Sequence, residues 1–224
     1  MLQLADTAMA GHLMAAGILA RDVLQRLEEE LSERDPALGG PCPLDAERLR
    51  SRDAAMAYGI WLYMLVRVLQ PATVLETGVQ NGCSTEFILW AIRRNGRGRL
   101  FSIDSGPTSS DGSHQTPWHR TANGIPGQGI LQPLKSEWDL TIGLSRDTLP
   151  DVCRRAGSVG LFWHDSDHSP ENVRFEFTTV QPFVPSGGML CLHDFEGQDV
   201  ALDEDAHELI VPQCAPYLRV WRKH

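Results

Sequence analysis

Two short apolar segments in the second half of the chain are each followed by side chains that bind metals or move protons. Segment 159–163 (Val-Gly-Leu-Phe-Trp) is followed by His164 and Asp165, and segment 189–192 (Met-Leu-Cys-Leu) by the pair His193-Asp194. Such runs are typical of buried parallel strands. Because the parallel strands of an open α/β sheet end at a shared edge, we expect Asp165 and the pair at 193–194 to face one crevice.

Carboxylate and imidazole groups that converge on an open crevice form a metal-site arrangement. A divalent ion there would hold two adjacent substrate oxygens and lower the pKa of a hydroxyl. His168 stands three residues after Asp165, where it could accept that proton as a general base. Each aspartate could instead cap a following helix, but Asp165 and Asp194 together favour a metal site. His164 is expected to point into the packed interior.

An acidic, glycine-containing turn lies earlier in the chain, between an apolar run at 72–75 and a helical pattern at 86–92. It begins at Glu76 and contains Gly78 and Gly82, which permit positive φ and close approach of the backbone to a ligand. A strand, a tight turn and a helix in this order build a nucleotide-sized crevice. The G-x-G-x-x-G dinucleotide fingerprint is absent, and a Glu76 carboxylate facing the crevice would repel a pyrophosphate.

A second predicted strand at 98–105 also ends in an acid, Asp104. An acid about 20 residues beyond such a glycine turn typically bonds ribose hydroxyls, so Glu76 and Asp104 together indicate an unphosphorylated adenosine ligand. A third strand at 138–143 leads to Ser145, which would either lie beside the adenine or cap the next helix. A generic α/β protein with an incidental glycine turn is the alternative interpretation.

The run Glu76-Thr77-Gly78-Val79-Gln80-Asn81-Gly82 resembles the acid-x-Gly-x-x-x-Gly motif of class I S-adenosylmethionine-dependent methyltransferases. The later segments resemble the metal-dependent, macrocin-type small-molecule O-methyltransferases: Asp165-x-x-His168, a helix, a turn at 185–188, a strand and then His193-Asp194. The resemblance spans about 55–196. It implies an α/β fold with a Rossmann-like, doubly wound, seven-stranded sheet, mostly parallel with one antiparallel strand.

The resemblance also implies a set of site residues and cofactors. S-adenosylmethionine and magnesium (Mg²⁺) or another divalent cation would be bound, and the acceptor would be a hydroxyl of a small molecule such as a sugar or a polyketide-type natural product. The metal ligands would be Asp165, His193 and Asp194, with His168 as the catalytic base. The cofactor contacts would come from Glu76, Thr77, Gly78, Gly82, Ser84, Asp104, Ser105 and Ser145.

The chain is expected to divide into an N-terminal helical extension, 1–55, and a methyltransferase domain, 56–224. Residues 1–35 follow helical spacing, and a further helix is expected at 45–69 after a linker rich in proline and glycine. The extension could cover the active site, join two subunits into a homo-oligomer or simply pack on the domain.

Two other segments flank this pattern. Residues 105–136 are rich in glycine, proline and serine and predict a long loop, either a lid over the substrate or a loop remote from the chemistry. Apolar runs at 208–211 and 217–221 favour the antiparallel strands that close such a sheet.

Composition narrows the class of protein. A formal net charge of −9 argues against a nucleic-acid partner, and the 5 cysteines lack the spacing of a zinc knuckle or a disulfide framework. No signal peptide or membrane-spanning run is evident, so we expect a cytoplasmic protein with a small-molecule substrate and no membrane partner. A non-catalytic cofactor-binding or assembly protein on the same fold, and an N-methyltransferase, are the alternative functions.

Overall fold

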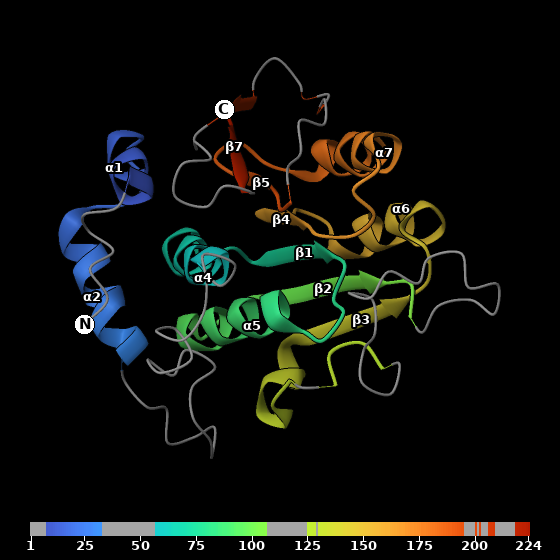
Figure 1. Ribbon diagram of the computed structural model, residues 1–224, viewed down its shortest axis with the longest axis horizontal. Helices are drawn as coiled ribbons and strands as arrows, with labels where there is room; N and C mark the ends of the chain where they lie inside the picture. The colour runs from blue at the N-terminus through green and yellow to red at the C-terminus, as the bar shows by residue number, and fades with distance from the viewer. Residues whose placement is uncertain are drawn as a thin grey trace.

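The computed structural model describes residues 8–32, 57–106, 125–128, 130–194, 200, 202, 206–208 and 218–224. Within them, a 7-stranded sheet has the order β3-β2-β1-β4-β5-β7-β6 (Figure 1). The strands are β1 (Thr73–Thr77), β2 (Arg99–Asp104), β3 (Trp138–Ile142), β4 (Leu161–His164), β5 (Met189–Leu192), β6 (Ala206–Glu208) and β7 (Arg219–Lys223). The first five strands in this order, β3, β2, β1, β4 and β5, run parallel to one another, and β7 runs antiparallel to its neighbours β5 and β6. The predicted fold class is confirmed.

Helices cover both faces of this sheet. The helices α4 (Ala57–Leu69) and α5 (Cys83–Asn95) share one hydrophobic core, and α6 (Ser145–Ala156) and α7 (Pro170–Val180) share the other. Adjacent β4 residues Phe162 and Trp163 belong to opposite cores, because successive side chains of a strand point to opposite faces. Burial on both faces explains why these strands are continuous apolar runs in the sequence.

The N-terminal segment forms two helices where one was predicted. The described part of 1–35 contains α1 (Ala8–Ala15) and α2 (Arg21–Ser32), so the prediction of a single helix is wrong. Gly17 ends the first helix: it has a φ of 67°, and its N–H donates to the Met14 carbonyl at 3.0 Å. Glycine stops a helix in this way because it adopts the left-handed conformation without a steric penalty.

The two N-terminal helices pack against α4. Leu13 and Leu24 are buried in the core that contains α4 and α5. The Glu30 carboxylate of α2 accepts hydrogen bonds from Arg67 Nε and Nη2 of α4 at 2.9 and 2.8 Å, and the Tyr63 hydroxyl also donates to it. The helices therefore dock on the domain within one chain. Their predicted roles as a lid or a subunit contact stay predictions.

Other predicted segments are described only in part. The helix expected at 45–69 is seen from 57 onward as α4, and its first part lies outside the described residues. Within the expected loop at 105–136, residues 125–128 form a turn and η6 (Gln132–Glu137) is a 3-10 helix; 107–124 and 129 lie outside the description. A second 3-10 turn, η7 (Gln181–Phe183), follows α7.

The C-terminal strand expected at 217–221 is present as β7. Of the run expected at 208–211 only Glu208 is described, as the last residue of β6, and 209–217 lie outside the description. In the part of the chain that is described, no helix has both the length and the apolar character needed to cross a bilayer.

Candidate functional site

Neighbouring strands end level with one another at the carboxyl edge of the sheet. In the sheet register Thr77 is aligned with Ile103 of β2 and with His164 of β4, and His164 is aligned with Leu192 of β5. The next residue of each strand therefore stands in one row, in the order Asp104, Gly78, Asp165, His193. Neighbouring strands lie about 4.8 Å apart, so the glycine turn that begins at Gly78 lies directly between Asp104 and Asp165.

Glu76 does not face the crevice, contrary to the sequence-based expectation. Its side chain is 0% exposed, and its carboxylate accepts hydrogen bonds from the hydroxyls of Ser84 at 2.6 Å, Thr85 at 2.8 Å and Ser102 at 2.7 Å. Burial, with a smaller contribution from the charge of Asp165, raises the pKa of Glu76 to about 7 against the opposing effect of these hydrogen bonds. Glu76 therefore fastens β1, β2 and the start of α5 together behind the turn.

Glycine is required at Gly78 by the contact between two backbones. Gly78 has a φ of 84°, and a Cβ atom there would lie 2.0 Å from the carbonyl oxygen of Asp165. Gly82, with a φ of 87°, precedes α5, and a Cβ there would lie 2.7 Å from the Ile130 side chain. The two glycines therefore let the turn pack closely between the metal-binding candidates on one side and the segment at 125–130 on the other.

Asp104 holds the tip of the same turn. Its Oδ2 accepts hydrogen bonds from the backbone N–H groups of Val79 and Gln80, both at 2.9 Å, and its Oδ1 accepts one from Gly106 at 2.8 Å. Asp104 is half-buried and Ser105 beside it is exposed. Unlike Glu76, Asp104 is therefore partly exposed to solvent.

The other predicted hydroxyl contacts are already engaged inside the protein. The Ser84 hydroxyl donates to Glu76, and the Thr77 hydroxyl donates to Glu176 of α7 at 2.6 Å. Ser145 is the first residue of α6 and not its cap, and its hydroxyl donates to the Asn172 side chain at 3.2 Å. Thr77 and Ser84, which are both buried, therefore support the turn from inside the protein, and the contact of Ser145 with the cofactor stays a prediction.

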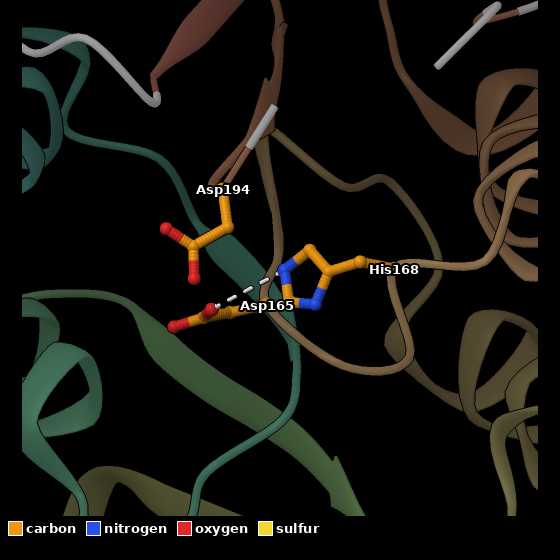
Figure 2. Close-up of side chains that lie close together, drawn as sticks. All are labelled: Asp165, His168 and Asp194. Carbon is orange, nitrogen blue, oxygen red and sulfur yellow. Dashed lines mark ion pairs between the residues drawn. The ribbon is translucent and has the colours of Figure 1, made fainter. Parts of the chain in front are cut away.

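Three side chains converge beyond the ends of β4 and β5. Asp165, His168 and Asp194 each offer one ligand atom, and these atoms all lie within 4.8 Å of one another (Figure 2). His168 Nε2 lies 3.8 Å from Asp165 Oδ1. Asp194 has a φ of 52°, a conformation that aspartate tolerates better than most residues and that is often found at functional sites. A divalent cation suits this donor set, because carboxylate oxygens and imidazole nitrogen are common metal ligands.

His193, the third predicted ligand, lies beside this group, with its Nε2 3.7 Å from Asp194 Oδ1. Its Nδ1 lies 2.9 Å from Asp165 Oδ1. Its ring stacks on Trp163 with the ring centroids 5.6 Å apart, and the Tyr58 ring is tilted against it with the centroids 4.3 Å apart. Burial lowers the pKa of His193, but the hydrogen bond to Asp165 and the charges of Asp165 and Asp194 outweigh it, so the pKa lies above its ordinary value. The contact with Nδ1 holds the Asp165 carboxylate in place, and the role of His193 as a metal ligand stays a prediction.

His168 has the opposite electrostatic environment. Burial and the neighbouring His164 lower the pKa of His168 below its ordinary value, although Asp165 and Asp194 act in the other direction. A neutral imidazole at pH 7 has a lone pair available for a proton or a metal ion. His164 itself is fully buried, as expected, with Nδ1 2.7 Å from Glu176 Oε2.

Two site residues were missed by the reasoning from sequence. Tyr58 of α4 contacts His193, and burial, Cys83 and Asp165 raise its pKa, so the phenol stays protonated. Glu176 of α7 is 0% exposed. The second had a detectable signal, because Glu176 lies at helical spacing among the apolar positions Val173, Phe177 and Val180 and a charged residue on that face needs partners.

Residues 75–195, more than half of the chain, match the family described as "Methyltransferase domain". The chain belongs to this family. The predicted membership of the class I methyltransferases, and with it the prediction of an enzyme, is confirmed. No curated protein matches the chain.

Solved methyltransferase structures share the fold at low sequence identity. The apo structure of CalS11, a TDP-rhamnose 3'-O-methyltransferase of calicheamicin biosynthesis, is 15% identical with a TM-score of 0.58, over 88% of this chain and 91% of that one. The O-methyltransferase NovP is 15% identical with a TM-score of 0.54, over 76% and 79%. TomG from Streptomyces achromogenes, solved with S-adenosylmethionine, is 16% identical with a TM-score of 0.52, over 85% and 91%.

Proposed function

We propose that this methyltransferase transfers the methyl group of S-adenosylmethionine to a hydroxyl oxygen of a small molecule, with a divalent cation, Mg²⁺ or a similar ion, holding the acceptor. The observation that carries the proposal is the group of Asp165, His168 and Asp194, which lies one strand away from the glycine turn at Gly78. Structural neighbours that are named O-methyltransferases support the same reaction class.

The cofactor would lie along the turn at 78–82 and over the ends of β2 and β3. Asp104, at the end of β2, is partly exposed and would accept hydrogen bonds from ribose hydroxyls, with Ser105 beside it. Ile142 and Leu144, at and just beyond the end of β3, are each 53% exposed. An apolar surface at that position would be covered by a flat ring such as adenine. Glu76, Thr77 and Ser84 would act indirectly, by holding the turn in place.

Asp165 and Asp194 would hold the ion, whose charge would lower the pKa of a bound acceptor hydroxyl. Hard divalent cations prefer oxygen ligands, so we assign His168 as the general base and His193 as the donor that orients the Asp165 carboxylate. Binding of the ion by His168 or His193 is the alternative assignment.

The chemical step then needs alignment and one proton transfer. The acceptor hydroxyl gives its proton to the neutral His168 ring. The oxygen forms a bond to the methyl carbon while the bond between that carbon and the sulfonium sulfur breaks, which leaves S-adenosylhomocysteine. Because the sulfonium already makes the methyl group electrophilic, the protein contributes mainly position and deprotonation.

The proposal is tested by the metal dependence of S-adenosylhomocysteine release. The enzyme is treated with EDTA, desalted and assayed with S-adenosylmethionine against a panel of sugars, catechols and amines, with and without added Mg²⁺. We expect turnover of acceptors that carry adjacent oxygens, lost after chelation and restored by the metal. Turnover that is indifferent to chelation, or that is confined to amines, would contradict the proposal and favour the N-methyltransferase alternative.

A further inference from the structure

A buried carboxylate, that of Glu176, is hydrogen-bonded both to the segment of the glycine turn and to the segment that carries Asp165. Glu176 of α7 accepts hydrogen bonds from the Thr77 hydroxyl at 2.6 Å and from the Ser166 hydroxyl at 2.7 Å. Thr77 immediately precedes Gly78 of the glycine turn, and Ser166 immediately follows Asp165. One side chain, fully buried, is therefore bonded to both ligand-binding segments.

The remaining lone pairs of this carboxylate are also satisfied. His164 Nδ1 lies 2.7 Å from Oε2, and Asn172 Nδ2 donates to Oε1 at 3.0 Å. Burial raises the pKa of Glu176, but the hydrogen bond and charge of His164, with the Ser145 and Thr77 hydroxyls, bring it below its ordinary value. A buried, charged carboxylate is stable only with such a complete set of donors, so Glu176 has a fixed geometry.

The two segments also contact each other directly. The Asp165 N–H donates to the Thr77 carbonyl at 2.8 Å. The backbones meet so closely that a Cβ on Gly78 would lie 2.0 Å from the Asp165 carbonyl oxygen. No side chain separates them, and a displacement of one segment must displace the other because both are fixed to the same acceptor.

We propose that Glu176 is a positioning residue that couples the two ligand sites, so that the adenosyl cofactor and the divalent ion each strengthen the binding of the other. This inference rests on the proposed function. Binding of the cofactor would fix the turn at Gly78, and through Thr77, Glu176 and Ser166 it would fix the segment that carries Asp165. The second ligand then binds a segment that is already ordered, which is a source of positive cooperativity.

Calorimetry measures the coupling without any turnover. Mn²⁺ is titrated into the full chain with and without saturating S-adenosylhomocysteine, and the ratio of the two dissociation constants is the coupling factor. For the wild type we expect a factor of at least about 5, the lower end of ordinary coupling between sites. For Glu176→Gln we expect a factor clearly below that of the wild type, because only the direct backbone contact between the two segments remains, while S-adenosylhomocysteine still binds the metal-free variant within about threefold of the wild type.

Two further variants sharpen the measurement. Thr77→Val removes one hydroxyl of the connection with little change of shape and should also lower the coupling factor; it decides the question if Glu176→Gln does not fold. Glu171→Gln, on the same helix but with a side chain 86% exposed, is the matched control and should keep the wild-type factor. A general loss of stability would weaken both ligands and would not remove the coupling alone.

The outcomes separate this inference from the proposed function. If both ligands bind the wild type independently, with a factor near 1, the coupling is refuted and the proposed function stands. An unchanged factor in both Glu176→Gln and Thr77→Val equally refutes the role of Glu176. If the wild type binds neither ligand, the proposed function itself fails.

Discussion

The pH dependence of folding offers a direct test of the position of Glu76. Glu76 is buried, and its pKa is raised from 4.5 to about 7. Between these two values the folded protein keeps a proton that the unfolded chain has released. Because the folded state binds more protons there, the free energy of unfolding falls as the pH rises through this window. The contribution of neutral Glu76 is complete below pH 4.5 and is lost above pH 7.

The expected magnitude follows from the shift in pKa. Each pKa unit corresponds to about 1.4 kcal/mol, so the full loss is about 3 kcal/mol, most of which falls between pH 5 and pH 8. The amide side chain introduced by Glu76→Gln has a similar shape, carries no charge and still offers one oxygen to the hydroxyls of Ser84, Thr85 and Ser102. The variant should therefore escape this loss and become more stable relative to wild type as the pH rises.

Urea denaturation at pH 5, 6, 7 and 8, without cofactor or metal, measures this difference. Other titrating groups are shared by both proteins and largely cancel in the comparison. Glu171→Gln, at an exposed position of α7, is the control and should show a difference that does not change with pH. A Glu76→Gln difference that is also constant from pH 5 to pH 8 would refute the buried, proton-binding position of Glu76.

Three further predictions concern the site. Asp165→Asn should weaken Mn²⁺ binding at least about tenfold, with the affinity for S-adenosylhomocysteine little changed in the absence of metal. Asp167→Asn, at an exposed neighbouring position, should leave Mn²⁺ binding unchanged. If calorimetry shows equal effects of the two variants, the metal does not bind at Asp165. His168→Gln should lower kcat by about 10²- to 10⁴-fold with a smaller change in KM, and wild-type kcat across the pH range would remove His168 as the base. Gly78→Ala should abolish cofactor binding or folding, because the added Cβ would lie 2.0 Å from the Asp165 carbonyl oxygen. Gly96 also has a positive φ, 64°, but nothing lies within 4 Å of an added Cβ, so Gly96→Ala should lower the free energy of unfolding by only about 1 kcal/mol. Thermal unfolding of the two variants makes the comparison.

Much of this site was predictable because strand ends are visible in the sequence. Apolar runs buried on both faces stop abruptly at acidic residues, and parallel topology then brings Asp104, Gly78, Asp165 and His193 to one edge. The same burial is the reason why the sequence did not show which way the Glu76 side chain points. The strand β1 is buried along its whole length, so its sequence has no alternation of polar and apolar residues that would mark a solvent-exposed face. The hydroxyl groups that bond Glu76 come from other elements, α5 and β2.

The two histidines show the corresponding limit for side-chain roles. Sequence spacing places both His168 and His193 near Asp165 but does not specify which ring turns toward the acidic pair. In the structure His193 is held beside Asp165 by Tyr58 and Trp163, which come from distant segments. The break at Gly17 was missed for a related reason, since Ile18 and Leu19 continue the apolar pattern across the turn and hide the change of direction.

The distance between the methyl group and the metal tests the central claim most directly. S-adenosylmethionine labelled with ¹³C at its methyl group is bound to the protein, and its NMR signal is followed as paramagnetic Mn²⁺ is added. The account predicts strong broadening that is reversed by excess Mg²⁺ and absent in the double variant Asp165→Asn, Asp194→Asn. A methyl signal that stays sharp while Mn²⁺ binds would contradict it, because the metal would then lie away from the reacting group.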